Sequence, residues 1–124
     1  MTIRGFGELE AVVMDELWSR SEPATVRSVH DELVAQRQIA YTTVMSTMDN
    51  LFRKGWLLRD KVGLAYRYRP TMSREEHSAK LMRTVFESGG DSELILNFFL
   101  EQVSEDDSAK MRQALRRFTR NRSR

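Results

Sequence analysis

A short segment from Ala40 to Lys54 carries the residue types best suited to contact a nucleic acid. Apolar residues recur in it with the helical period of about 3.6 residues, at positions 41, 44, 45, 48, 51 and 52. The opposite face carries short polar groups and one guanidinium: Thr42, Thr43, Ser46, Thr47, Asn50 and Arg53. Short hydroxyl side chains approach a surface closely and hydrogen-bond base edges or phosphate oxygens in a DNA groove. This helix alone supports two interpretations equally, DNA contact and a helix that happens to be rich in Thr and Ser; the flanking elements decide between them.

Positive charge is concentrated directly after this helix. Residues 51–71 hold six Lys or Arg and one Asp, a net charge of +5, although the whole chain carries only +2. The candidates for phosphate contact are Arg53, Lys54, Arg67 and Arg69. Each one alone is equally well explained as a solvated surface charge. As a cluster beside a hydroxyl-rich helix, they indicate polyanion binding, and Arg67 is also placed to reach a minor groove.

Three helices and a hairpin are expected to position these groups. The apolar periodicity predicts helices over about residues 8–20, 25–36 and 40–54, with Thr25 as the N-cap of the second. Gly55 lies where a residue in the left-handed conformation would end the third helix.

Two short strands are expected next, over residues 56–60 and 64–69. A two-stranded hairpin is not stable alone, so Tyr66 and Tyr68 are expected to pack it against the helices. Three helices followed by a hairpin is the element order of a winged helix-turn-helix, which we assign to residues 1–71. The predicted fold class is therefore mainly α with a β-hairpin wing.

Residues 72–124 are predicted to form three further helices that serve as a dimerisation domain. Capping signals at Ser73 with Glu76, and at Asp91, mark two of their starts. The helix after Asp91 is apolar on almost every side, and a small monomer cannot bury such a helix. We expect a second copy of the chain to cover it; the alternative is one strongly buried helix in a single domain. The expected interface residues are Val85, Phe86, Leu94, Ile95, Phe98, Phe99, Val103, Leu115 and Phe118.

The end of the chain is strongly basic. Residues 108–124 contain seven Lys or Arg and no acid. We expect residues 116–124 to be a disordered or frayed polybasic tail that adds nonspecific affinity for DNA.

Several classes of function lack the residues they need. The absence of cysteine excludes disulfides, thiolate metal sites and a cysteine nucleophile. His30 and His77 lie on different predicted helices without ligand spacing, so we expect no metal. No phosphate loop, serine nucleophile or paired carboxylates are recognisable, so we expect neither an enzyme nor a cofactor. The longest apolar run, residues 94–100, is too short to span a bilayer and no signal pattern precedes the first helix, so we expect a cytoplasmic protein without direct membrane association.

Motifs along nearly the whole chain occur in a familiar order and spacing. They are Glu8-Leu9-Glu10, Val13-Met14, Leu17-Trp18, Ala40-Tyr41-Thr42-Thr43-Val44-Met45, Lys54-Gly55, Tyr66-Arg67-Tyr68 and Leu96-Asn97-Phe98. Together they resemble the winged-helix repressors of the penicillinase-repressor family (BlaI, MecI and their copper-responsive relatives). The chain lacks the C-terminal cysteine motifs of the copper-responsive branch, so the resemblance does not extend to copper sensing.

The resemblance implies a homodimer that binds a dyad-symmetric operator on double-stranded DNA and blocks transcription. Some members of the family take part in an antibiotic response, in which a membrane sensor-protease signals a β-lactam and the repressor is then cut. The cut bond, Asn-Phe, corresponds to Asn97-Phe98 in this chain. The alternative is that Asn97 only places a polar group on a buried helix and is never cut. Two other functions remain open: a winged-helix module that binds an acidic protein, and a repressor released by a small ligand.

Overall fold

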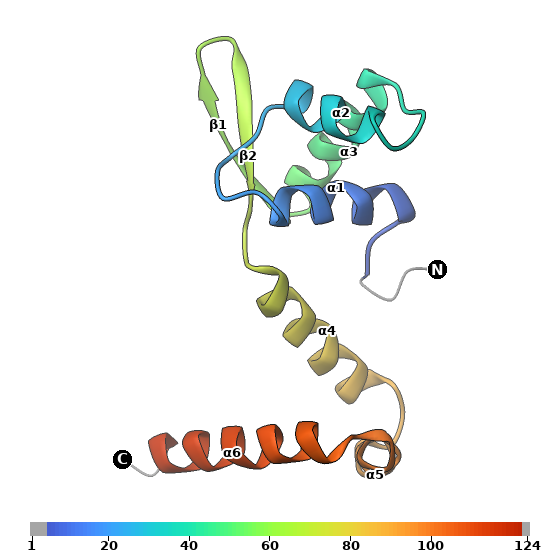
Figure 1. Cartoon of the computed structure of the whole chain (residues 1–124), viewed down its shortest axis with the longest axis vertical. Helices are drawn as coiled ribbons and strands as arrows, with labels where there is room; N and C mark the ends of the chain where they lie inside the picture. Colours follow the sequence, from blue (N-terminus) through green and yellow to red (C-terminus); the bar gives the residue numbers. More distant parts are fainter. Residues whose placement is uncertain (1–4, 123–124) are drawn as a thin grey trace. The chain divides into compact units, whose positions relative to one another are not determined.

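A computed structural model describes residues 5–122 and contains six helices and one antiparallel hairpin in these residues (Figure 1). The fold class is mainly α, as predicted. The chain divides into two compact units, Met1–Leu81 and Met82–Arg124. The elements are α1 (Glu8–Trp18), α2 (Val26–Val34), α3 (Tyr41–Arg53), β1 (Leu57–Val62), β2 (Ala65–Pro70), α4 (Arg74–Ser88), α5 (Ser92–Gln102) and α6 (Glu105–Arg122).

The first unit is a winged helix-turn-helix with one apolar core. Its three helices and its hairpin each contribute side chains to the core, and α3 packs against both α1 and α2. Burial of these side chains is the main force that holds the three short helices together, because helices of this length are marginal alone. The core residues are Phe6, Val13, Met14, Leu17, Ala24, Val29, Leu33, Val44, Met48, Leu51, Leu57 and Tyr68.

Local capping signals begin α2 and end α3 where the sequence predicts. The Thr25 hydroxyl accepts a hydrogen bond from the Ser28 amide at 3.1 Å and so caps α2. Gly55 has φ +86°, a conformation that L side chains rarely adopt, and it ends α3. The next amide, of Trp56, donates to the Leu51 carbonyl at 2.9 Å, which turns the chain into β1.

The hairpin is anchored at its second strand. Tyr68 is 3% exposed, and its backbone exchanges two hydrogen bonds of 2.9 Å with Ala24, in the connection between α1 and α2. Tyr66, in contrast, is 42% exposed. The expectation that both tyrosines pack the hairpin against the helices is therefore confirmed for Tyr68, whereas Tyr66 stays partly exposed and contacts the guanidinium of Arg59. The bridge to Ala24, which adds a third segment beside the hairpin, was not predicted.

The first turns of α4 belong to the first unit. The His77 ring is buried and stacks on Phe6 with 4.7 Å between centroids and 9° between planes. Trp18 and Trp56 complete this cluster of four rings, and the Trp18 indole donates to the Met72 carbonyl at 3.0 Å. The compact unit thus continues beyond residue 71, where the sequence places the domain boundary.

Capping side chains also define the helices that follow. The Ser73 hydroxyl and the Glu76 carboxylate cap each other's backbone amides at the start of α4, at 3.0 and 3.1 Å. The Asp91 carboxylate accepts from the amides of Glu93 and Leu94 at 2.9 and 3.2 Å and starts α5. These predicted caps are confirmed.

The second unit leaves its apolar side chains uncovered within one chain. Neither α5 nor α6 contains a buried residue. The basic segment is helical to Arg122, so the expectation of a frayed end is wrong up to that residue; residues 123 and 124 lie outside the described part of the chain. Acidic residues in the first turn of α6 and Arg in its last turn complement the helix dipole and stabilise both ends of the helix. No helix within residues 5–122 is long and apolar enough to cross a membrane.

Candidate DNA-binding surface

Helix α3 presents a polar face to solvent while its apolar face enters the core. Val44, Met48 and Leu51 are fully buried and fix the rotation of the helix about its axis. Five of the predicted contact residues are exposed on the outer side: Thr42, Thr43, Ser46, Asn50 and Arg53. In a helix-turn-helix, the second helix of the motif enters the major groove with its first residues nearest the bases. The positions of these hydroxyls fit that role.

Thr47 is not part of this outer face. It is 8% exposed, and its hydroxyl donates to the Thr43 carbonyl at 2.8 Å. The sequence placed Thr47 on the polar face because a threonine at the edge of an amphipathic helix fits either side, and a bond to the carbonyl four residues earlier satisfies its hydroxyl. The prediction that Thr47 is exposed is wrong, and Thr47 leaves the set of accessible candidates.

The two cations at the end of α3 differ in how they are held. Arg53 is 74% exposed at its side chain and pairs with Asp49 at 2.9 Å within the same helix. Lys54 pairs with Glu10 of α1 at 2.7 Å, a contact between residues 44 positions apart in sequence. Burial raises the pKa of Glu10, but the Lys54 ammonium and the Gly7 amide outweigh it, so the pKa lies below its ordinary value. Lys54 therefore ties α3 to α1, and it remains more than half exposed.

The wing supplies two unpaired guanidinium groups. Arg67 and Arg69 alternate with Tyr66 and Tyr68 along β2, so they lie on the outer face of the hairpin. Both are exposed, and neither has an ion-pair or hydrogen-bond partner for its side chain among residues 5–122. Unpaired cations on a wing are available to phosphate oxygens without a prior ion pair having to break.

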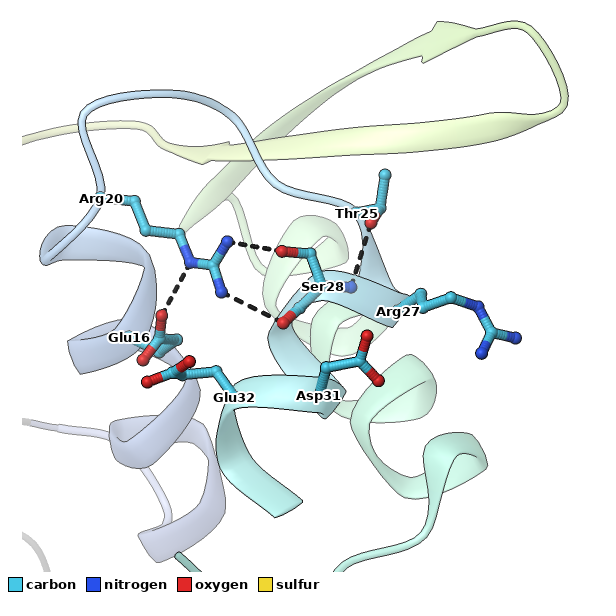
Figure 2. Close-up of a pocket in the computed structure, with 7 residues that line it drawn as sticks. All are labelled: Glu16, Arg20, Thr25, Arg27, Ser28, Asp31 and Glu32. Atoms are coloured by element: carbon cyan, nitrogen blue, oxygen red, sulfur yellow. Dashed lines mark hydrogen bonds and ion pairs between the residues drawn. The ribbon is translucent and has the colours of Figure 1, made fainter. Parts of the chain in front are cut away.

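The structure adds a cation that the sequence reasoning missed. Arg27 lies in the first turn of α2, and its guanidinium carbon is 5.2 Å from the ring centroid of Tyr41 at the start of α3. Figure 2 shows its side chain extending away from its neighbours on α2. The first helix of a helix-turn-helix crosses the DNA backbone, so a cation early in that helix was a recognisable signal.

The hollow between α1 and α2 has its central polar groups already paired (Figure 2). Arg20, two residues after the end of α1, donates to the Glu16 carboxylate at 2.7 Å and to the Ser28 hydroxyl and carbonyl at 2.6 and 3.1 Å. Its guanidinium therefore links Glu16 of α1 to Ser28 of α2, and Asp31 and Glu32 also line the hollow. Within residues 5–122 no cluster of three or more His, Asp or Glu could hold a metal ion. His30 bonds the Ile39 carbonyl at 2.9 Å and supports the turn before α3.

Solved structures with the same architecture place the fold in the winged-helix class. A MarR family protein from Bacillus stearothermophilus has a TM-score of 0.50 and 16% identity, covering 97% of this chain and 77% of that chain. MepR, a transcription regulator of a multidrug efflux pump in Staphylococcus aureus, has a TM-score of 0.50 and 16% identity, covering 94% and 80%. At this identity the likeness concerns the fold alone.

Sequence comparison gives the family. The model of the penicillinase repressor family matches residues 6–117. The transcriptional regulator BlaI of Mycobacterium tuberculosis strain CDC 1551 is 43% identical over 112 residues, which cover 88% of this chain and 81% of the relative. BlaI of strain H37Rv matches with the same values. The chain belongs to the penicillinase repressor family, as the motifs indicated, and these relatives are regulators rather than enzymes.

Proposed function

We propose that this protein is a homodimeric transcriptional repressor that reads a dyad-symmetric DNA operator. Its membership of the penicillinase repressor family and its similarity to BlaI support the regulatory role. The observation that carries the proposal is the exposed face of α3, where hydroxyl and amide groups replace the usual Glu and Lys of a solvated helix. In the proposed complex, Thr42, Thr43, Ser46 and Asn50 contact base edges in the major groove.

The surrounding cations have a different role in the proposal. Arg53, Arg67 and Arg69, together with Lys54 and Arg27, contact phosphates and set the position of α3 in the groove. Phosphate contacts position a protein but carry little sequence information, whereas contacts to base edges specify the site. Specificity should therefore depend on α3, and the salt dependence of binding should depend on the arginines.

Binding to the promoter of the protein's own gene tests this proposal. Footprinting should locate a protected dyad whose half-sites lie about one helical turn apart or a multiple of it. Anisotropy titrations of that duplex and of a shuffled duplex, at several salt concentrations, should show preference for the former and a steep loss with salt. Equal affinity for both duplexes would refute sequence reading. Weak binding that is insensitive to salt would favour the alternative, a module whose basic wing contacts an acidic protein.

The exposed apolar side chains of the second unit support a homodimer. Phe98 is 61% exposed, Phe118 64% and Leu115 66%, and Val85, Leu94 and Phe99 are each more than two-fifths exposed. An apolar surface of this kind marks an interaction site. A second copy of the chain fits because closed, two-fold assemblies are the commonest oligomers and because a dyad-symmetric operator requires two DNA-binding units. Ile95 and Val103 are half-buried and contribute less new burial.

Release from DNA by proteolysis at Asn97-Phe98 is a further part of the proposal. The bond lies inside α5, so a protease reaches it only after local opening of that helix. Cutting there removes Phe98, Phe99 and α6 from the DNA-binding half. Each remaining half binds one half-site without its tethered partner, which costs a factor of about 10² to 10⁴ in affinity.

An immunoblot of cells exposed to a β-lactam tests the mode of release. Cleavage by a membrane sensor-protease pathway should give a fragment that ends at Asn97 while the target promoter becomes active, and Asn97→Asp should slow its appearance. Activation of the promoter with the protein still at full length would reject cleavage. That result would favour the alternative of a repressor released by a small ligand.

A further inference from the structure

Arg59 lies between the wing and α3 rather than on the outer surface. It belongs to β1 and faces Tyr68 across the hairpin, on the opposite face from Arg67 and Arg69. Its guanidinium carbon is 4.0 Å from the ring centroid of Phe52 and 4.1 Å from that of Tyr66. A planar guanidinium stacks on aromatic rings in this way, whereas the ammonium of a lysine is a point charge without a plane. Arg59 therefore joins a ring of α3 to a ring of β2.

The same guanidinium also donates two hydrogen bonds. Its Nη1 donates to the Asp49 carboxylate of α3 at 3.1 Å and to the Tyr68 hydroxyl of β2 at 3.3 Å. The hydrogen bond to Tyr68 is the largest influence that raises the pKa of Arg59. With its side chain 22% exposed, Arg59 has little surface left for phosphate oxygens.

Asp49 extends this network to a candidate DNA contact. Its Oδ1 accepts from Arg59, while its Oδ2 pairs with the Nε of Arg53 at 2.9 Å. One carboxylate thus links the buried side of the wing to the exposed guanidinium of Arg53. The network therefore joins three elements, β1, β2 and α3.

We propose that Arg59 is a positioning residue for DNA recognition, which fixes the wing relative to α3 and orients Arg53 through Asp49. This inference rests on the proposed function. The wing arginines and the outer face of α3 then contact one half-site together. Because the wing is already fixed, binding does not lose affinity through the entropic cost of ordering it. Loss of Arg59 should leave the guanidinium groups of Arg67 and Arg53 present but no longer aligned with the DNA groove.

A double-mutant cycle on the full-length protein tests this role. Arg67→Ala should weaken operator binding about tenfold for each half-site in the wild-type background, as expected for one charged hydrogen bond per subunit. In Arg59→Met, where the stem still packs between the rings, the same change should cost less than about threefold, because the wing is already misaligned. Arg59→Lys keeps the charge but not the stacked plane, so it should also reduce the effect of Arg67→Ala.

Lys61→Met provides the matched control. This substitution removes one cation from β1, on the same face of the hairpin as Arg59. The Lys61 side chain has no ion pair within residues 5–122. The effect of Arg67→Ala should remain about tenfold in that background, since independent sites add. Circular dichroism melts identify any variant that unfolds. If Arg59→Met unfolds, the milder change Arg59→Lys carries the test.

The outcomes separate the two proposals. An undiminished, tenfold effect of Arg67→Ala in both Arg59 variants would overturn the positioning role while leaving the repressor function intact. A similar reduction in Lys61→Met would also overturn it, because charge alone would then explain the result. Failure of the wild-type protein to prefer its operator over a shuffled duplex would instead overturn the proposed function itself.

Discussion

Replacing Phe98 by Ala should weaken the dimer more than any change on the wing. Phe98 is 61% exposed in the single chain, and an aromatic side chain of this kind buries roughly 150–250 Å² when covered. Covering the exposed part by a partner removes roughly 100 Å² from water. At about 25 cal/mol per Å² this contributes about 2.5 kcal/mol per subunit. A two-fold dimer loses the contact twice, so dissociation should become roughly a thousandfold to ten thousandfold easier.

Sedimentation equilibrium over a dilution series measures this change directly. Leu64→Ala is the matched control, because Leu64 at the tip of the wing is 100% exposed and belongs to the first unit. The dimer dissociation constant of Leu64→Ala should equal that of the wild type, and both Phe98→Ala and Leu64→Ala should keep the wild-type helix content. Equal dimer constants for Phe98→Ala and Leu64→Ala would refute the assignment of α5 to the interface. A wild-type protein that stays monomeric at high micromolar concentration would refute the dimer altogether.

Three further changes test the first unit. Thr43→Ala should weaken binding to the operator more than binding to a shuffled duplex, as measured by anisotropy, because the Thr43 side chain is exposed. Thr47→Ala should leave that preference unchanged and lower the free energy of unfolding in urea by about 1 kcal/mol, because the buried Thr47 hydroxyl loses its hydrogen bond. His77→Ala should cost roughly 2–4 kcal/mol in urea unfolding, since the buried ring fills a cluster of aromatic rings. Glu10→Gln should lower the melting temperature at pH 7, because a depressed carboxyl pKa stabilises the fold above the unfolded-state pKa. The difference should vanish as the pH falls through the folded-state pKa of Glu10, and a difference that persists at still lower pH would show that Glu10 acts through packing.

Signals that act within about one helical turn were readable from the sequence by itself. The caps at Thr25, Ser73 with Glu76, and Asp91 are bonds between a side chain and a backbone amide two or three residues away. Gly55 ends α3 because a positive φ is accessible to glycine without strain. These local features, with the apolar periodicity, were enough to predict the order of helices and hairpin and to place the polar face of α3.

Contacts between distant residues were decided only by the tertiary structure. Lys54 and Arg59 belong to the same basic run as Arg67, yet one pairs with Glu10 on α1 and the other lies between two aromatic rings. A list of cations does not show which of them face inward, since that depends on the strand face and on the partners that folding brings near. Thr47 is buried for a related reason: its small side chain fits either side of an amphipathic helix, and the packing of α3 against its neighbours selects the side.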